Sequence, residues 1–153
     1  MMLELRHEFL CEIVGDLGEP QVIGETPYGM RLIIPVTGGT VQGPKINGKA
    51  LPFGADWLVM RRDGVVELNV RVTVQTDDGA LIYVSYRGLN KTAPEVMARM
   101  QAGEQVDPAE YYFRTTPVFE TGAPQYAWLN QIITVGVGMR QPGQVRYKVY
   151  QIL

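Results

Sequence analysis

Strict alternation of apolar and polar residues is the clearest pattern in this sequence. In residues 65–76 (VVELNVRVTVQT), the even-numbered positions from 66 to 74 are all valine or leucine, and the odd positions from 67 to 75 are polar or charged. A period of two is typical of a β-strand that buries one of its faces. We therefore expect a strand here, with the valine face in the core and Arg71 and Glu67 on the outside.

Similar apolar or alternating runs recur along the whole chain and are separated by turn dipeptides. The expected strands are 3–14, 30–36, 40–46, 49–52, 56–61, 65–76, 80–87, 113–120, 126–140 and 144–152. The turn dipeptides are Asn47-Gly48, Asp63-Gly64, Asp78-Gly79 and Pro142-Gly143. Such dipeptides supply the positive φ angles of tight hairpins, and hairpins join antiparallel neighbours.

One short helix interrupts the strands near residues 93–102, where Pro94 fits a first helical turn and Gly103 fits its end. The pattern therefore predicts an all-β fold with a single domain spanning residues 1–153. We expect an antiparallel β-barrel, a meander of about eight to ten strands, because a barrel removes the exposed edges that a sandwich keeps.

Composition excludes several kinds of chemistry. Cys11 is the single cysteine and His7 the single histidine, so an intramolecular disulfide and a Cys- or His-clustered metal site are both excluded. We expect no metal and no cofactor. With a formal net charge of -2 and no basic run, the sequence indicates no nucleic-acid surface. It shows no signal-peptide core and no membrane-spanning run, so we expect a cytoplasmic protein without a membrane partner.

Candidate binding residues cluster in residues 111–130 (YYFRTTPVFETGAPQYAWLN), where large rings alternate with a few polar groups. This composition suits a pocket for a small molecule, which needs apolar area and sparse polar anchors. On the expected strand 126–140, a spacing of two would place three of these residues on one face. The predicted ligand-binding residues are Trp57, Tyr112, Arg114, Glu120, Tyr126, Trp128 and Asn130.

Two further residues are candidates for catalysis. Asp56 stands beside Trp57, where desolvation would raise its pKa toward the range used by general acids and bases. The alternative is that Asp56 satisfies backbone amides at a turn after Gly54. Tyr83 is the second candidate for proton transfer.

Long strings of the sequence resemble a bacterial family catalogued only as a domain of unknown function, DUF3237. They are residues 24–57 (GETPYGMRLIIPVTGGTVQGPKINGKALPFGADW), 76–84 (TDDGALIYV), 110–122 (EYYFRTTPVFETG), 126–130 (YAWLN) and 149–153 (VYQIL). The resemblance implies a small, calycin-like antiparallel barrel and no established activity.

The residues support three functions. The first is a barrel that binds a small apolar or aromatic molecule carrying an anionic or polar group. The second is a cofactor-independent enzyme, an isomerase, cyclase or lyase, in which Asp56 or a tyrosine moves a proton while Arg114 holds an anion. The third is a structural or oligomer-forming module without a ligand, and outward-facing valines are compatible with a homodimer.

Overall fold

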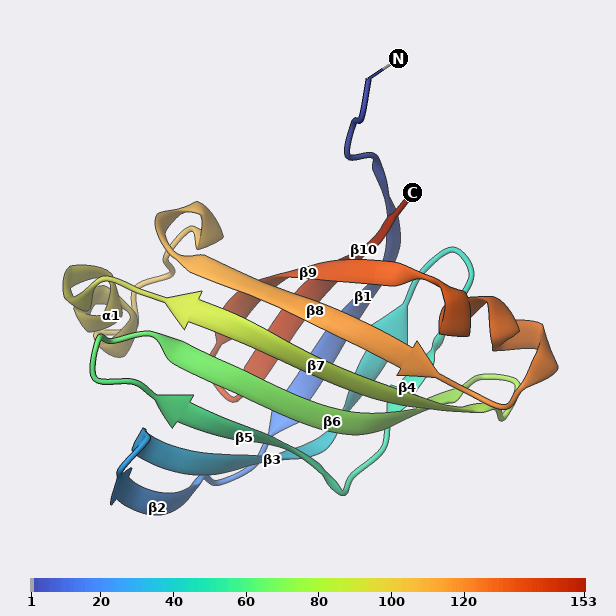
Figure 1. Cartoon of the computed structure of the whole chain (residues 1–153). Coiled ribbons are helices and arrows are strands. Elements are labelled where there is room, and N and C mark those ends of the chain that lie inside the picture. Colours follow the sequence, from blue (N-terminus) through green and yellow to red (C-terminus); the bar gives the residue numbers. More distant parts are fainter. Residues whose placement is uncertain (1) are drawn as a thin grey trace.

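Ten β-strands form one antiparallel sheet that closes on itself (Figure 1). The structure is a computed structural model and describes residues 2–153. The first five strands are β1 (His7–Leu17), β2 (Gln21–Thr26), β3 (Gly29–Gln42), β4 (Gly48–Ala50) and β5 (Gly54–Met60). The others are β6 (Val66–Thr76), β7 (Leu81–Lys91), β8 (Tyr112–Glu120), β9 (Ile133–Gln141) and β10 (Gln144–Ile152). The helical elements are α1 (Pro94–Gln101) and two 3-10 helices, η1 (Pro108–Glu110) and η2 (Pro124–Gln131).

The barrel closes through the pairing of β1 with β3. From β1 the order of neighbours runs β10, β9, β8, β7 and β6; β4 and β5 then share the next position, and β3 returns to β1. β2 lies outside this ring and pairs with β3 alone. The antiparallel barrel expected from the sequence is therefore confirmed.

Alternation along the strands decides which side chains fill the interior. On β6, Val70, Val72 and Val74 are buried, whereas Arg71 is exposed on the outer face. Gly138 on β9 makes room for a large inward side chain. A Cβ added to Gly138 would lie 2.6 Å from ring atoms of Phe113. The barrel is thus packed by side chains that meet across its interior.

Three of the four expected hairpin turns have the predicted backbone. Gly64, Gly79 and Gly143 have φ angles of 85°, 90° and 69°, in the region that favours glycine. At Asn47-Gly48 the expected antiparallel hairpin forms between β3 and β4, but the turn is the longer loop 43–47, because Gly48 already belongs to β4. The Asn47 side chain instead holds the loop before β4 through both polar groups of Gly43.

The expected strand 126–140 is also wrong in its first half. Residues Pro124–Gln131 form the 3-10 helix η2, and β9 begins only at Ile133. β2 was not predicted at all. The expected helix near 93–102 is confirmed as α1, which lies at one end of the barrel (Figure 1). We call this end, which also carries η1, the α1 end. No helix in residues 2–153 is long and apolar enough to cross a membrane.

Candidate functional site

Asp56 is a carboxylate held in the barrel interior. It lies on β5, level with Ile34 of β3 and Val70 of β6, and is 7% exposed. The ladder between β5 and β6 pairs Asp56 with Val70 and resumes only at Val59. In this interruption the backbone N–H of Asn69 donates to Asp56 Oδ1 at 3.0 Å. The sequence of β5 thus replaces a ladder hydrogen bond with a side-chain acceptor.

The second carboxylate oxygen of Asp56 is free of protein partners. No hydrogen bond to Oδ2 is formed within residues 2–153. Oδ2 is also absent from the fully enclosed, unpartnered polar atoms of these residues, which are Thr115 Oγ1 and Arg146 Nε. A water molecule can therefore touch Oδ2, although the residue is buried.

Arg140 acts electrostatically on Asp56, and the Asp56 charge acts on two buried tyrosines. Burial raises the pKa of Asp56 to about 6, and the Asn69 hydrogen bond and the positive charge of Arg140 oppose this rise. Tyr86 on β7 and Tyr147 on β10 meet across the interior with ring centroids 5.2 Å apart. Burial raises the pKa of both hydroxyls above their ordinary value, and the Asp56 charge adds to the rise.

Arg140 is the member of this group that lies at the surface, at the α1 end of the barrel. Arg140 is exposed near the end of β9 and follows Gly136 and Gly138 at the spacing of two that defines one strand face. Its backbone N–H donates to the buried Tyr111 hydroxyl at 3.2 Å. We call Asp56, Tyr86, Tyr147 and Arg140, which influence one another electrostatically, the Asp56 cluster.

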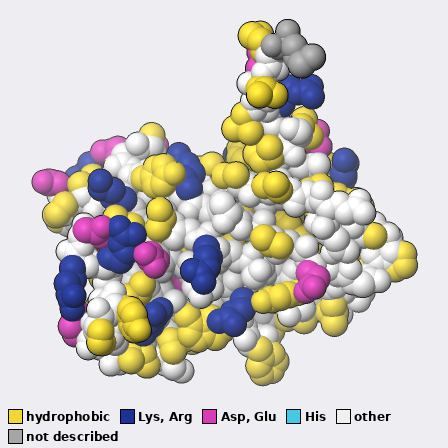
Figure 2. Space-filling model, viewed as in Figure 1, with side chains coloured by type: hydrophobic (Ala, Val, Ile, Leu, Met, Phe, Trp, Pro, Cys, Tyr) yellow, Lys and Arg dark blue, Asp and Glu magenta, His cyan; other side chains and the backbone are white. Residues whose placement is uncertain are grey.

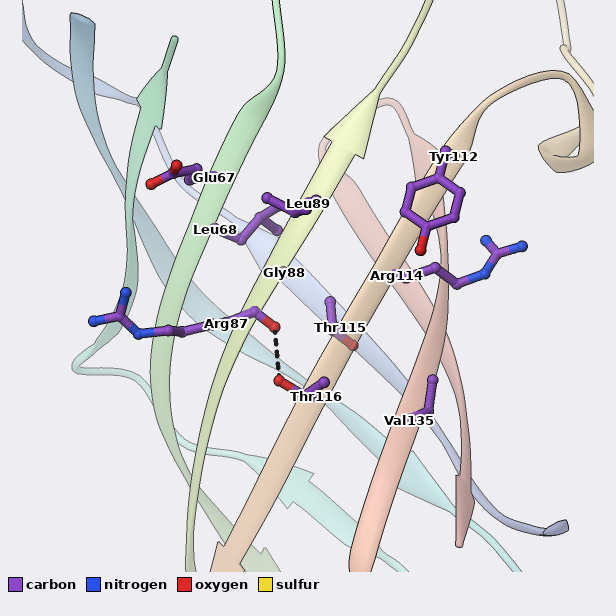
Figure 3. A pocket seen from close by; sticks show the side chains of 10 residues that line it. All are labelled: Glu67, Leu68, Arg87, Gly88, Leu89, Tyr112, Arg114, Thr115, Thr116 and Val135. Carbon is purple, nitrogen blue, oxygen red and sulfur yellow. Dashed lines mark hydrogen bonds between the residues drawn. The ribbon is translucent and has the colours of Figure 1, made fainter. Parts of the chain in front are cut away.

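Four of the residues predicted from the sequence lie instead on the outer wall. Tyr112 and Arg114 stand together on β8, with the guanidinium carbon 5.1 Å from the Tyr112 ring centroid. Both line an open groove of about 640 Å³ on the outside of the barrel (Figure 3). Tyr83 on β7 is 41% exposed and pairs with Glu120 at the other end of β8. The structure does not bring these four residues to Asp56.

Trp57, although adjacent to Asp56, points away from it. Consecutive residues of a strand face opposite sides, and Trp57 packs on the outer wall with the guanidinium carbon of Arg71 at 4.4 Å from its ring centroid. The expected pairing of Asp56 with a tryptophan wall is therefore not formed.

The other three predicted residues lie on η2, on the far side from the α1 end. The Asn130 side chain forms two hydrogen bonds with the Thr121 backbone: it accepts from the N–H at 2.8 Å and donates to the carbonyl at 2.9 Å. The Tyr126 hydroxyl donates to Asp78 Oδ1 at 3.1 Å. Trp128 lies under Lys45, whose Nζ is 5.6 Å from the ring centroid. These contacts hold the loop before β9, and the three residues share no strand face.

Sequence reasoning missed Tyr86, Tyr147 and Arg140. For Tyr86 a signal exists, because it shares the spacing of two with Ile82 and Val84, the more apolar face of residues 80–87. That pattern favours Tyr86 over Tyr83 as the inward ring. Tyr147 and Arg140 come from other strands, and their approach to Asp56 depends on barrel closure. No group of three or more His, Cys, Asp or Glu within residues 2–153 could hold a metal ion.

The fold and the interior carboxylate define a small antiparallel barrel protein with a titratable group inside. The family model "Protein of unknown function (DUF3237)" matches residues 5–152, and the chain belongs to this family. A UPF0311 protein of Rhodopseudomonas palustris is 40% identical over 97% of each chain. A crystal structure of a conserved protein of unknown function from R. palustris superposes with a TM-score of 0.92 at 39% identity, covering 99% of this chain and 100% of that one.

A more distant solved structure shares the fold. It is described as an enzyme from Penicillium herquei and superposes with a TM-score of 0.74, covering 100% of this chain and 98% of that one. Its identity to this chain is 20%, so the likeness extends to the fold alone.

Proposed function

We propose that the protein is a cofactor-independent enzyme that accepts a small apolar or aromatic molecule at the α1 end and moves a proton through Asp56. An isomerase, a cyclase or a lyase would use such a group. The observation that carries this proposal is the free, reachable Oδ2 of a carboxylate that is otherwise buried.

Keeping a carboxylate in the barrel interior costs stability, and only one of the Asp56 oxygens has a protein partner. Buried polar atoms are almost always hydrogen-bonded, and a buried charge weakens the fold unless it is paired. Asp56 uses one oxygen for Asn69 and leaves the other unpartnered. The structural role, accepting the amide left by the interrupted ladder, involves Oδ1 and leaves Oδ2 open to water or a substrate.

The protonation behaviour of the cluster suits proton transfer. With a pKa of about 6, Asp56 populates both its charged and its neutral form near neutral pH, which a group that takes and returns a proton needs. Tyr86 and Tyr147 stay protonated because burial raises their pKa values. The two hydroxyls are hydrogen-bonded to each other, which leaves one hydroxyl hydrogen of the pair suited to donate to a substrate oxygen that gains negative charge. Arg140 would favour an anionic group at the α1 end.

The distant Penicillium structure supports an enzyme on this scaffold, because its description calls it one and the fold is shared. Its description gives no reaction.

A direct test uses 5-nitrobenzisoxazole as a probe. A base that removes the proton on C3 breaks the N–O bond and releases a coloured cyanonitrophenolate, so no metal, oxidant or cofactor takes part. A partly desolvated carboxylate is a strong base for this reaction. We expect saturable elimination whose rate rises with pH through about 6, and loss of this rate in Asp56→Asn.

The matched control is Asp77→Asn, which makes the same change at an exposed residue in the turn between β6 and β7. This variant should behave as the parent protein does. Equal rates and equal pH profiles for the parent and Asp56→Asn would contradict the proposal. If the protein only binds small molecules, the parent protein and Asp56→Asn should both bind the probe, and neither should convert it.

The homodimer expected from the sequence remains a prediction. Val118 and Ile133, which are 59% and 73% exposed, give the outer wall apolar area that a second copy could cover. Sedimentation at several concentrations tests it, and a monomer mass throughout would contradict it.

A further inference from the structure

We propose that the outer wall formed by β6, β7 and β8 carries a second binding site, specific for small aromatic acids and organised by three arginines. The arginines are Arg71, Arg87 and Arg114, which we call the arginine row. This site is separate from the Asp56 cluster, because its residues face outward from the barrel.

The sheet register places the arginine row on one diagonal. Arg71 pairs with Ser85, two residues before Arg87. Arg87 in turn pairs with Thr116, two residues after Arg114. Diagonal neighbours on one face of an antiparallel pair are roughly 7–8 Å apart. Three arginine side chains therefore start at similar steps across three adjacent strands.

The charges of the arginine row are not neutralised by the protein. Within residues 2–153, none of the three guanidinium groups forms a salt bridge. Glu67 is the carboxylate that lines the groove, and Arg61 already engages it at 3.1 Å. The three guanidinium groups therefore remain available to an anionic ligand.

Aromatic rings hold two of the three arginines in place. Arg71 stacks on Trp57 and Arg114 on Tyr112, with guanidinium carbons 4.4 Å and 5.1 Å from the ring centroids. Arg114 Nη1 also donates to the Phe113 carbonyl at 2.9 Å. Such stacking orders the side chain before a ligand arrives and so lowers the entropy lost on binding.

Two adjacent hollows of the groove lie along the arginine row. The larger part, about 640 Å³, and a smaller part, about 440 Å³, share Arg87 and Thr116. Figure 3 shows Gly88, Thr115 and Thr116 between Arg87 and Arg114, whose guanidinium groups point away from each other to either side. On the same face, Figure 2 shows Lys and Arg side chains among hydrophobic ones over these strands.

The lining identifies the class of ligand. Leu89, Tyr112 and Val135 provide apolar area beside the guanidinium groups. A flat apolar body with a carboxylate at one or both ends matches this combination, because guanidinium groups bind carboxylates through paired hydrogen bonds. An aromatic dicarboxylate can engage two arginines of the row and should bind more tightly than a monocarboxylate.

The test is calorimetric titration with 2-naphthoate, naphthalene-2,6-dicarboxylate and the neutral 2-naphthamide. We expect affinity to fall in the order dicarboxylate, monocarboxylate, amide, and to fall with added salt. Arg87→Ala and Arg114→Ala should each weaken dicarboxylate binding roughly tenfold, which corresponds to the loss of one charge-assisted interaction. The dicarboxylate should also shift the backbone amide NMR signals of Gly88 and Thr116.

Arg62→Ala is the matched control, because Arg62 is exposed and lies outside the groove. It should bind the dicarboxylate as the parent protein does, and so should Asp56→Asn. Equal binding of the amide and the acids, no binding at all, or equal affinities in Arg62→Ala, Arg87→Ala and Arg114→Ala would overturn the inference. Binding that is lost in Asp56→Asn and retained in both groove variants would place the acid at the Asp56 cluster, against this inference and in line with the proposed function.

Discussion

The backbone N–H of Asn69 donates to Asp56 Oδ1 across 3.0 Å, where the ladder between β5 and β6 is interrupted. This contact binds one oxygen of a buried carboxylate to the barrel wall and leaves the other free. Oδ1 therefore takes part in the fold, and Oδ2 is the oxygen that we propose for proton transfer. The protonation state of Asp56 should affect both the stability of the protein and the proposed reaction, and both effects can be measured as a function of pH.

Replacing Asp56 with asparagine should stabilise the protein above pH 6. Burial raises the folded-state pKa of Asp56 from 3.8 to about 6, so between these values the folded state binds more protons than the unfolded state. The stability of the parent protein therefore falls as pH rises through this window, by up to about 3 kcal/mol at this residue. Asp56→Asn has no carboxyl group at this position, so its free energy of unfolding should not decrease in this way.

Urea unfolding of both proteins at several pH values between 4 and 8 checks this prediction. The difference in the free energy of unfolding should grow in favour of Asp56→Asn up to about pH 6 and then stay constant. A difference that does not vary with pH would show that Asp56 titrates alike in both states.

Thr115 and Thr134 form a natural pair for testing the cost of an unpartnered hydroxyl. Both residues are 1% exposed. Thr115 Oγ1 has no partner, whereas Thr134 Oγ1 donates to the Pro117 carbonyl at 2.7 Å. Valine keeps the shape of threonine, so Thr115→Val should stabilise the protein by about 1 kcal/mol and Thr134→Val should destabilise it by about 1 kcal/mol. Denaturant unfolding measures both, and equal effects in the two variants would disprove the assignment.

Gly138→Ala should destabilise the barrel by about 2 kcal/mol, because overpacking forces neighbours from their positions. The added Cβ would lie 2.6 Å from the Phe113 ring, which itself packs at 5.4 Å between centroids against Tyr147. Gly122→Ala is the control, since nothing lies within 4 Å of a Cβ added there. Equal melting temperatures for Gly138→Ala and Gly122→Ala would contradict the close contact between Gly138 and the Phe113 ring.

Cys11 should resist alkylation in the folded protein. It is fully buried, and burial raises its thiol pKa to about 12, so almost no thiolate is present at pH 8. Mass spectrometry after iodoacetamide treatment should show no modification without denaturant and complete modification in urea. Rapid labelling of the folded protein would show that β1 opens readily.

The sequence predicted the barrel because its signals are local. Alternation on residues 65–76 placed Val70 inside and Arg71 outside, and Asp78-Gly79 supplied the turn that follows. The expected strand 126–140 was wrong because a spacing of two between Tyr126, Trp128 and Asn130 also arises by chance. Pro124, which fits a first helical turn, was the contrary signal there.

The site was only partly predictable for a different reason. Asp56 and its desolvation could be inferred from its own segment, and the structure places it inside the barrel. Its partners Tyr86, Tyr147 and Arg140 lie on three other strands. They meet Asp56 only when the sheet closes, and spacing along one strand does not encode which residues face each other across a barrel.

Carbon NMR of the Asp56 carboxyl, assigned by comparison with Asp56→Asn, tests the central claim most directly. We predict that the signal titrates with a pKa of about 6, and that 5-nitrobenzisoxazole elimination follows the same curve. A carboxyl that titrates near its ordinary value of about 4, with no elimination that depends on it, would contradict the account.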